Sequence, residues 1–174
     1  MTQASDPTPD DIRPGEMAAA LPEHFDAGLY FIGRIRTPWT RRSDCPHNAR
    51  EAQERGATCR IEVDPRYQAA LKGVEGCSHL IVLYWMNEAR RDLMQQRPRH
   101  VAEPRGTFSL RSPVRPNPIA LSVVRLLKAE GTALSVTGLD CLDATPLLDI
   151  KPYFASTDSV PEATTPHSAS GQKT

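Results

Sequence analysis

The residues from Arg111 to Pro118 combine two guanidinium groups, Arg111 and Arg115, with three prolines in a run of eight residues. Each proline fixes its own φ near about −65° and disfavours helical geometry in the residue before it, so this loop is expected to be stiff. A stiff loop has already lost much of the entropy that binding costs, and a guanidinium group can hold an anionic or planar ligand. The stretch therefore predicts a binding loop. A solvated Arg/Pro-rich connector is the alternative interpretation.

A second stretch, LDCLDATPLLDIKPYF at 139–154, sets charged residues among apolar ones. If a reaction here left a proton on an amine, Asp140 or Asp149 could take it directly or through water. Aspartates that cap loops are the alternative. The sequence contains no GxG, Walker A, GxSxG or HExxH motif, so it gives no support to a dinucleotide-binding or common hydrolase site.

Taken together, RSPVRPNPIALS (111–122) and LDCLDATPLLDIKPY (139–153) resemble the TsaA-like family, whose characterised members are the TrmO tRNA methyltransferases. FIGRIRTP (31–38) and YQAALKGVEGCSHLIVL (67–83) extend the resemblance over roughly 29–154. It implies an S-adenosylmethionine-dependent enzyme that acts as a homodimer. The implied reaction is methylation of N6 in a threonylcarbamoyl-modified adenosine beside the anticodon of tRNA.

The resemblance also implies positions for the site. The cofactor pocket would be lined by Pro46, His47, Asn48, Asn87, Glu88, Arg111, Leu121, Leu142, Asp143, Ala144 and Thr145. The residues expected to face RNA are Arg115, Lys151 and Tyr153, since arginine and lysine meet phosphate and tyrosine offers a stacking surface. Arg111 is the strongest single candidate, because its fork can hold a carboxylate or a carbonyl with two hydrogen bonds.

Some positions depart from the family pattern. Asn87 and Glu88 replace a common His-Gln pair, and only Pro46 matches the usual Pro-Arg-Gln segment. Ala120 and Ala144 stand where glycine is usual, so each added methyl is expected to narrow the pocket or to restrict a turn that needs positive φ. The additional C-terminal domain of longer bacterial members is not expected after residue 174, which leaves the methyl acceptor open.

Two further functions are compatible with these residues. The first is a methyltransferase that uses the same cofactor on a small molecule; the second is a non-catalytic module that binds the cofactor or RNA. A metal site at Cys45 and His47 is the other interpretation of that segment, but two candidate ligands without partners do not define one, and no metal is expected.

Composition agrees with a single globular domain: 174 residues, 39% of them hydrophobic, are enough for one core. The 21 basic and 21 acidic residues cancel, although seven arginines lie between 90 and 115 and predict a local positive patch or a solvated face. The polar, acidic N-terminal residues do not resemble a signal peptide, so none is expected, and the sequence contains no apolar run of membrane-spanning length. The four cysteines form no CxxC pair, so a reducing cytoplasm with free thiols is expected.

The expected fold class is mostly β: one small β-barrel domain with a few short helices and long loops. Strands are predicted at 29–36, 59–63, 79–86, 107–110, 134–137 and 147–150, while 122–129 fits either a helix or a strand. A hairpin turn is predicted at Gly131, and short helices at 48–55 and 65–71. Residues 1–27 are expected to be a flexible or wrapped-on arm with a possible helical turn at 17–21, 28–155 the barrel domain, and 156–174 a flexible tail.

Overall fold

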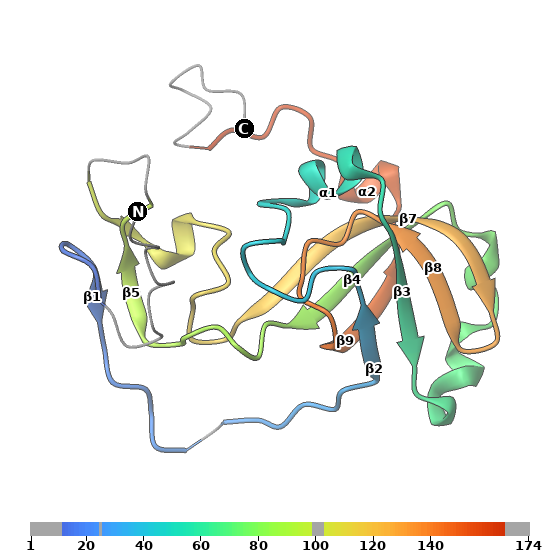
Figure 1. Cartoon of the computed structure of the whole chain (residues 1–174), viewed down its shortest axis with the longest axis horizontal. Coiled ribbons are helices and arrows are strands. Elements are labelled where there is room, and N and C mark those ends of the chain that lie inside the picture. Colours follow the sequence, from blue (N-terminus) through green and yellow to red (C-terminus); the bar gives the residue numbers. More distant parts are fainter. Residues whose placement is uncertain (1–11, 25, 99–102, 166–174) are drawn as a thin grey trace, which may run out of the picture.

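The protein is built on a closed barrel of six antiparallel strands. The structure, a computed structural model, describes residues 12–24, 26–98 and 103–165. Around the barrel the strand order is β2, β3, β8, β7, β4, β9, closing from β9 back to β2 (Figure 1). The strands are β2 (Gly33–Arg36), β3 (Thr58–Val63), β4 (His79–Trp85), β7 (Ile119–Glu130), β8 (Ala133–Thr137) and β9 (Thr145–Pro152). The expectation of a mostly β barrel is confirmed.

The core fills the inside of the barrel. In β4 every second side chain is buried, and the same alternation places Ile61 of β3 and Leu134 of β8 inside with no exposed surface. This period of two is what a strand with one buried face requires. The strand predicted at 79–86 is thus confirmed as β4, and its side chains alternate between buried and partly exposed positions.

The sequence left residues 122–129 undecided between helix and strand, and the structure makes them part of the twelve-residue strand β7. β7 pairs with β4 from Ile119 to Arg125 and with β8 from Arg125 to Glu130, so its two halves join two different neighbours. The β-branched residues Val123 and Val124 lie in the half paired with β4, and their strand propensity suits this position. The predicted hairpin at Gly131, whose φ is 59°, joins β7 to β8.

Three long connections meet at one end of the barrel. Because neighbouring strands are antiparallel, β2, β4 and β8 finish at the same end where β3, β7 and β9 begin. The connections at this end are 37–57, 86–118 and 138–144, and we call it the loop end. The opposite end carries 64–78, the turn at 131–132 and the chain after β9.

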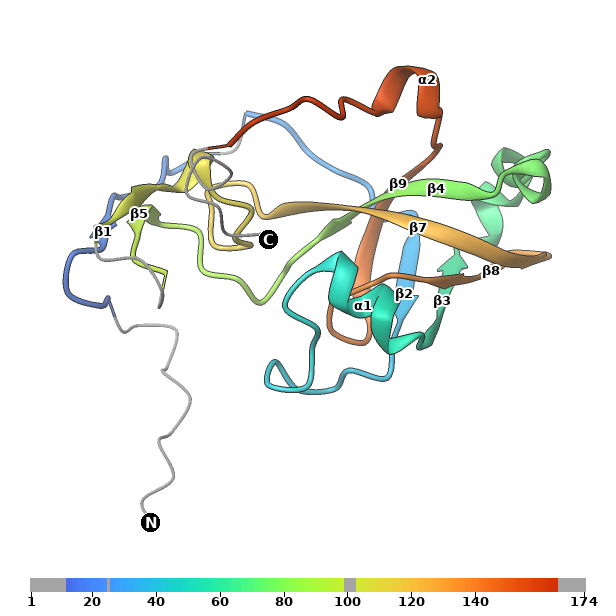
Figure 2. The same ribbon diagram turned by 90° about the horizontal axis from the view of Figure 1, so that it is seen from above.

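A small three-stranded sheet lies to the side of the barrel, as both views show (Figures 1 and 2). It contains β1 (Met17–Ala18), β5 (Leu93–Gln96) and β6 (Arg105–Gly106), in the order β1, β5, β6. In place of the helical turn considered at 17–21, Met17 and Ala18 pair in extended conformation with β5. Residues 1–11 of the predicted arm lie outside the described residues.

Two predicted strands differ from the structure. Residues 107–109 form a 3₁₀ helix, η3 (Thr107–Ser109), because the hydroxyls of Thr107 and Ser109 donate to the carbonyls of Leu93 and Gly106 and compete with strand pairing. The first barrel strand begins at Gly33 rather than at residue 29, since the side chains of residues 29–31 are exposed and lie before the paired segment.

The remaining elements are short helices. The predicted helix at 48–55 is α1 (Ala49–Arg55), and the predicted helix at 65–71 is the 3₁₀ helix η1 (Pro65–Leu71), followed by η2 (Val74–Gly76). α2 (Ala155–Asp158) follows β9, and residues 166–174 of the predicted tail lie outside the described residues. Within the described ranges, no helix is both long enough and apolar enough to cross a membrane.

Candidate active site at the loop end

The loop end gathers most of the residues predicted to bind a cofactor. Three of them lie on the connection 37–57, three on 86–118, and three on 138–144. The other two, Leu121 and Thr145, lie near the beginnings of β7 and β9, next to the loop end. The barrel topology therefore brings together segments that are far apart in the sequence.

The connection 138–144 contains a turn that the sequence marked as unusual. Ala144 has φ 63°, the one positive φ of a non-glycine residue in the described part of the chain. Arg34 donates from Nη1 to the Ala144 carbonyl at 3.1 Å, and the Thr145 hydroxyl donates to the Leu142 carbonyl at 2.7 Å. Ala144 therefore lies in a turn with positive φ, the conformation in which the added methyl was expected to restrict the chain. Ala120 lies instead in the extended strand β7 and packs against the core.

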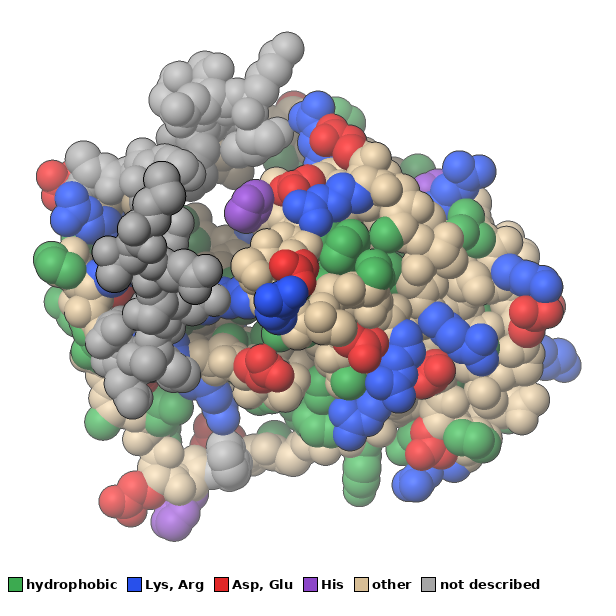
Figure 3. Space-filling model, in the orientation of Figure 1, with side chains coloured by type: hydrophobic (Ala, Val, Ile, Leu, Met, Phe, Trp, Pro, Cys, Tyr) green, Lys and Arg blue, Asp and Glu red, His purple; other side chains and the backbone are tan. Residues whose placement is uncertain are grey.

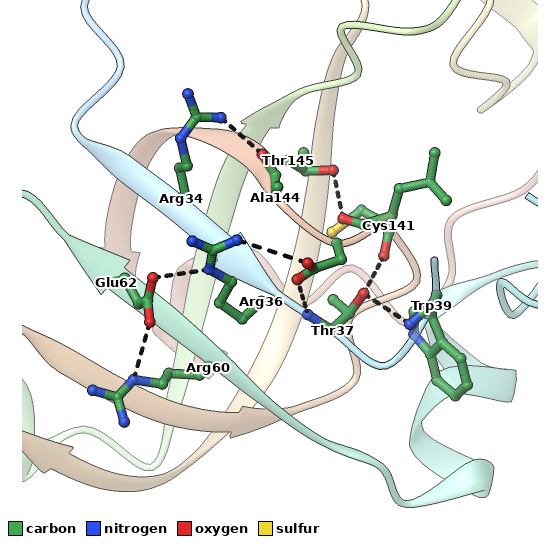
Figure 4. A network of polar contacts seen from close by, with 11 residues as sticks. Arg34, Arg36, Thr37, Trp39, Arg60, Glu62, Cys141, Ala144 and Thr145 are labelled. Carbon is green, nitrogen blue, oxygen red and sulfur yellow. Dashed lines mark hydrogen bonds and ion pairs between the residues drawn. The ribbon is translucent and has the colours of Figure 1, made fainter. Parts of the chain in front are cut away.

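Asp143 links this turn to β2. Its Oδ1 accepts a hydrogen bond from the backbone N–H of Thr37 at 3.1 Å, and its Oδ2 lies 3.7 Å from Nη1 of Arg36. The backbone N–H of Asp143 donates to the Trp39 carbonyl at 2.8 Å. Figure 4 shows the arginines of β2 and β3 and this turn in one polar network, in which Glu62 joins Arg36 to Arg60. Asp143, which was predicted to line the cofactor pocket, therefore also fixes the conformation of this turn.

Thr37 and Trp39 hold the backbone on both sides of Asp140. The Thr37 hydroxyl donates to the Cys141 carbonyl at 2.9 Å and accepts from the backbone N–H of Trp39 at 3.2 Å (Figure 4). The Trp39 indole N–H donates to the Leu139 carbonyl at 3.2 Å. Leu139 and Cys141 are both buried. Sequence reasoning missed this clamp, because hydrogen bonds to backbone carbonyls leave no residue pattern.

On the connection 37–57, Pro46 is buried, whereas His47 and Asn48 are exposed. Asn48 is the N-cap of α1, since its Oδ1 accepts from the N–H of Glu51 at 2.9 Å, and the Glu51 carboxylate accepts from the His47 N–H at 2.8 Å. The hydrogen bond from His47 and the ion pair with Arg55 hold the pKa of Glu51 below its usual value.

Arg111 contacts Leu121, another residue predicted to bind the cofactor. The Nη2 of Arg111 donates to the Leu121 carbonyl at 2.9 Å, and Arg111 also lines a cavity of about 300 Å³. Gln96 and Ser112 line the same cavity, with Arg13, Pro98 and Leu110. Asn87 and Glu88 are exposed directly after β4, whose last residue pairs with the first of β7.

The arginine and proline loop is held by backbone contacts. Arg115, predicted to face RNA, donates from Nε to the Ser112 carbonyl at 2.9 Å and from Nη2 to the carbonyls of Thr107 and Leu110. Arg91 donates to the Pro116 carbonyl at 2.6 Å and lies over the Trp85 ring. The stiffness predicted from the prolines is thus reinforced by guanidinium groups turned onto the loop itself.

The two candidate proton acceptors occupy different places. Asp140, at the loop end, accepts through Oδ1 from the Tyr84 hydroxyl at 2.8 Å. Asp149 lies on β9, where its Oδ2 is 2.5 Å from Nζ of Lys151 and its Oδ1 accepts from the N–H of Ile150. Tyr153 follows β9 toward the opposite end, with its ring centroid 6.5 Å from that of His79.

Charges are interleaved rather than segregated on the face in Figure 3, where Lys and Arg side chains lie beside Asp and Glu. The predicted positive patch at 90–115 includes Arg90, which pairs with Asp92 at 2.7 Å. The four cysteines are free thiols, two of them buried. Among the described residues, no three His, Cys, Asp or Glu side chains gather as metal ligands would.

The structure places the chain in the class of small closed β-barrel proteins that carry a candidate binding site on the loops at one end of the barrel. Comparison with known proteins identifies the family. The family described as the tRNA-methyltransferase O N-terminal domain matches residues 34–159. The chain therefore belongs to the family of TrmO N-terminal domains, as the sequence motifs predicted.

Individual relatives agree with this assignment. The chain is 51% identical over 141 residues to a probable S-adenosyl-L-methionine-binding protein, VirR, of Rhizobium radiobacter, covering 81% of this chain and 79% of that protein. It is 42% identical over 93 residues to a mouse (Mus musculus) tRNA (adenine(37)-N6)-methyltransferase, covering 52% of this chain and 22% of that protein. The crystal structure of TrmO from Pseudomonas aeruginosa superposes with a TM-score of 0.68 at 32% identity, covering 82% of this chain. The present chain spans 63% of that solved chain.

Proposed function

We propose that the protein is an S-adenosylmethionine-dependent methyltransferase that acts on N6 of threonylcarbamoyladenosine beside the anticodon of tRNA. The observation that carries the proposal is the convergence of the predicted cofactor residues on three connections at one end of a TrmO-family barrel. Relatives named for S-adenosylmethionine binding and for tRNA adenine-N6 methylation support the cofactor and the reaction.

The donor groups at the loop end fit the cofactor. Buried Pro46 and half-buried Leu142 offer apolar surface for an adenine, while Asn48, Asn87 and Glu88 offer exposed amide and carboxylate groups for hydroxyls and an amino acid end. Bound there, S-adenosylmethionine would supply a methyl group already activated by a positively charged sulfur.

The chain's own residues then have mainly to position the reactants. The network around Thr37, Trp39 and Asp143 holds the turn 142–145 in one conformation, and Arg111 holds the stiff loop against β7. Orientation of this kind can contribute roughly 7 to 11 kcal/mol to a displacement reaction. A carboxylate, Asp140 or Asp149, is needed only to receive the proton that the methylated nitrogen releases.

For RNA, we propose that Lys151 and Tyr153 face the substrate from β9 and its end, and that Arg115 contributes through the guanidinium face that its loop contacts leave free.

We propose that the protein is a cytoplasmic homodimer. The outer face of β4 and β7 supports a dimer, because Ile119 and Leu121 are 39% and 43% exposed on it. Ile119→Asp should then give a monomer in light scattering, whereas an unchanged mass would exclude this face.

One observation favours a second candidate function. The relative that is 51% identical is named as a binding protein, with no reaction in its name. A non-catalytic module that binds S-adenosylmethionine would share the loop end and would give binding without product.

The deciding experiment is nucleoside mass spectrometry on tRNA from a strain that lacks its own enzyme of this family, incubated with the protein and isotope-labelled S-adenosylmethionine. The proposal predicts a labelled methyl on threonylcarbamoyladenosine. Arg111→Ala should abolish cofactor binding in calorimetry, while Arg66→Ala, on a surface arginine at the opposite end of the barrel, serves as the matched control. Cofactor binding with no labelled nucleoside would favour the binding module.

A further inference from the structure

A chain of three hydroxyl and carboxylate groups runs from the inside of the barrel to the loop end. The hydroxyl oxygens of Tyr84 and Ser122 are 2.9 Å apart, and the Tyr84 hydroxyl donates to Oδ1 of Asp140 at 2.8 Å. Tyr84 and Ser122 lie on neighbouring strands, β4 and β7, and Asp140 lies on the connection 138–144. These three residues connect the barrel interior with the site.

Tyr84 and Ser122 are each 2% exposed, so their hydroxyls need partners inside the protein. Tyr84 has one hydroxyl proton, which it donates to Asp140, and it can accept the proton of Ser122. Burial above all, and then the charge of Asp140, raises the pKa of Tyr84, so the phenol stays protonated and remains a donor. Within the described residues, Oδ2 of Asp140 has no hydrogen-bond partner.

The backbone on both sides of Asp140 is fixed. Leu139 and Cys141 are buried, and their carbonyls accept from the Trp39 indole and the Thr37 hydroxyl. Asp140 is therefore oriented by its backbone and by one oxygen of its carboxylate, which leaves the other oxygen for a reaction. The titratable neighbours that feel its charge are Tyr84, Cys141 and Cys45, all of them neutral groups whose pKa values are raised.

Asp149 differs in each of these respects. Its carboxylate accepts from its neighbour's N–H through Oδ1 and pairs with Lys151 through Oδ2, so both oxygens are occupied. It lies within β9, opposite Leu83 of β4, rather than on a connection at the loop end. Of the two carboxylates, Asp140 alone combines a fixed orientation with an oxygen that has no partner among the described residues.

We propose that Asp140 takes the proton of the methylated nitrogen on Oδ2 and that Tyr84 is the positioning residue that orients it. This inference rests on the proposed methyl transfer. As the nitrogen–carbon bond forms and the carbon–sulfur bond breaks, the sulfonium becomes a neutral thioether and the nitrogen carries the positive charge. The nitrogen's N–H proton then moves to the carboxylate, which becomes a carboxylic acid and returns the proton to water.

Conservative variants test both roles. Asp140→Asn keeps an oxygen that can accept from Tyr84 but removes the base, so kcat should fall by about 10²- to 10⁴-fold. Tyr84→Phe should lower kcat by about tenfold while the KM for both substrates stays within twofold, since it removes one hydrogen bond to a charged group. Tyr67→Phe makes the same change at the opposite end of the barrel and is the control.

Two kinetic outcomes would overturn the proposal. One is an unchanged kcat in Tyr84→Phe, with folding verified by thermal unfolding. The other is loss of turnover in Asp149→Asn with full turnover in Asp140→Asn. Should Tyr84→Phe fail to fold, Ser122→Ala removes the next hydroxyl and should lower kcat in the same direction by a smaller factor.

A measurement without turnover separates this inference from the proposed function. The hydroxyl proton of Tyr84, assigned by its absence from Tyr84→Phe, should appear far downfield in the proton NMR spectrum and move upfield in Asp140→Asn, because a hydrogen bond to a carboxylate is stronger than one to an amide. A resonance that does not respond to Asp140→Asn would overturn the orientation of Asp140 by Tyr84. Wild-type protein without methyl transfer would instead overturn the proposed function.

Discussion

Thr37 and Cys141 are 104 residues apart in the sequence, yet the Thr37 hydroxyl donates to the Cys141 carbonyl at 2.9 Å. This hydrogen bond ties the connection after β2 to the connection before β9. The same hydroxyl accepts from the N–H of Trp39, so one side chain serves both segments. The loop end is thus assembled by contacts between connections as well as by the barrel.

Replacing Thr37 by valine should loosen the loop end. The shape of the side chain is kept, but the Cys141 carbonyl and the Trp39 N–H both lose their partner. We expect a loss of about 1 to 3 kcal/mol in the free energy of unfolding measured with urea. Calorimetry should also show weaker S-adenosylmethionine binding. Thr40→Val changes an exposed neighbour on the same connection and should alter neither quantity; equal effects of the two variants would contradict the role of Thr37.

Ala144→Gly should stabilise the protein. A left-handed backbone costs a non-glycine residue roughly 1 to 2 kcal/mol, and this cost is removed by glycine. Glycine also gives the unfolded chain more conformational freedom, which offsets part of the stabilisation. At φ 63° we therefore expect a net increase of up to about 1 kcal/mol. Ala133→Gly, in the extended strand β8, should instead destabilise by about 0.5 to 1 kcal/mol. Urea unfolding measures both, and a loss of stability in Ala144→Gly would contradict the strain.

Alkylation should divide the four cysteines into two classes. Burial raises the pKa of Cys59 to about 11 and also raises the pKa of Cys141, and both side chains are at most 2% exposed. Because the thiolate is the reactive form, iodoacetamide at pH 8 should modify Cys45 and Cys77 in the native protein and spare the other two. Peptide mass spectrometry locates the labels. Unfolding in guanidinium chloride should expose all four, and early labelling of Cys141 would contradict the packing beneath Asp140.

The fold class and the family could be predicted because they depend on local signals. The continuous apolar run at 79–86 indicated the strand β4, and the hairpin at Gly131 was marked by its turn residue. The strand at 107–110 was predicted wrongly, because the hydroxyl of Thr107 finds the Leu93 carbonyl only in the folded chain. Local pattern contains no information about such a distant partner.

In the candidate site, too, some residues could be predicted from motifs, whereas others depend on partners that are distant in the sequence. Motifs placed Asp140 and Arg111, and the structure puts both at the loop end or beside it. Tyr84 was not singled out, because in the sequence it is one more large residue in a buried strand. A hydroxyl at a buried position must find a partner, and this was the signal that could have directed attention to it.

Glu51 should make the stability of the loop end depend on pH. Its folded pKa is lowered, first by the hydrogen bond from the His47 N–H and then by Arg55, so the charged form is favoured in the native state. The stabilisation is fully present above the ordinary value of 4.5 and is lost as the pH falls through the lowered pKa. Glu51→Gln should therefore lower the Tm at pH 7, and the difference from the wild type should shrink as the pH falls below 4.5.

Thermal unfolding followed by circular dichroism between about pH 3 and pH 7 measures this difference, with ionic strength held constant because exposed ion pairs are screened by salt. Glu75→Gln, in η2 at the opposite end of the barrel, removes the same charge away from α1 and should give a small difference that does not follow this curve. A Tm difference for Glu51→Gln that is as large at pH 3 as at pH 7 would show that the carboxylate's charge has no part in capping α1. The exposed positions of His47 and Asn48 would then be fixed by the Asn48 cap alone.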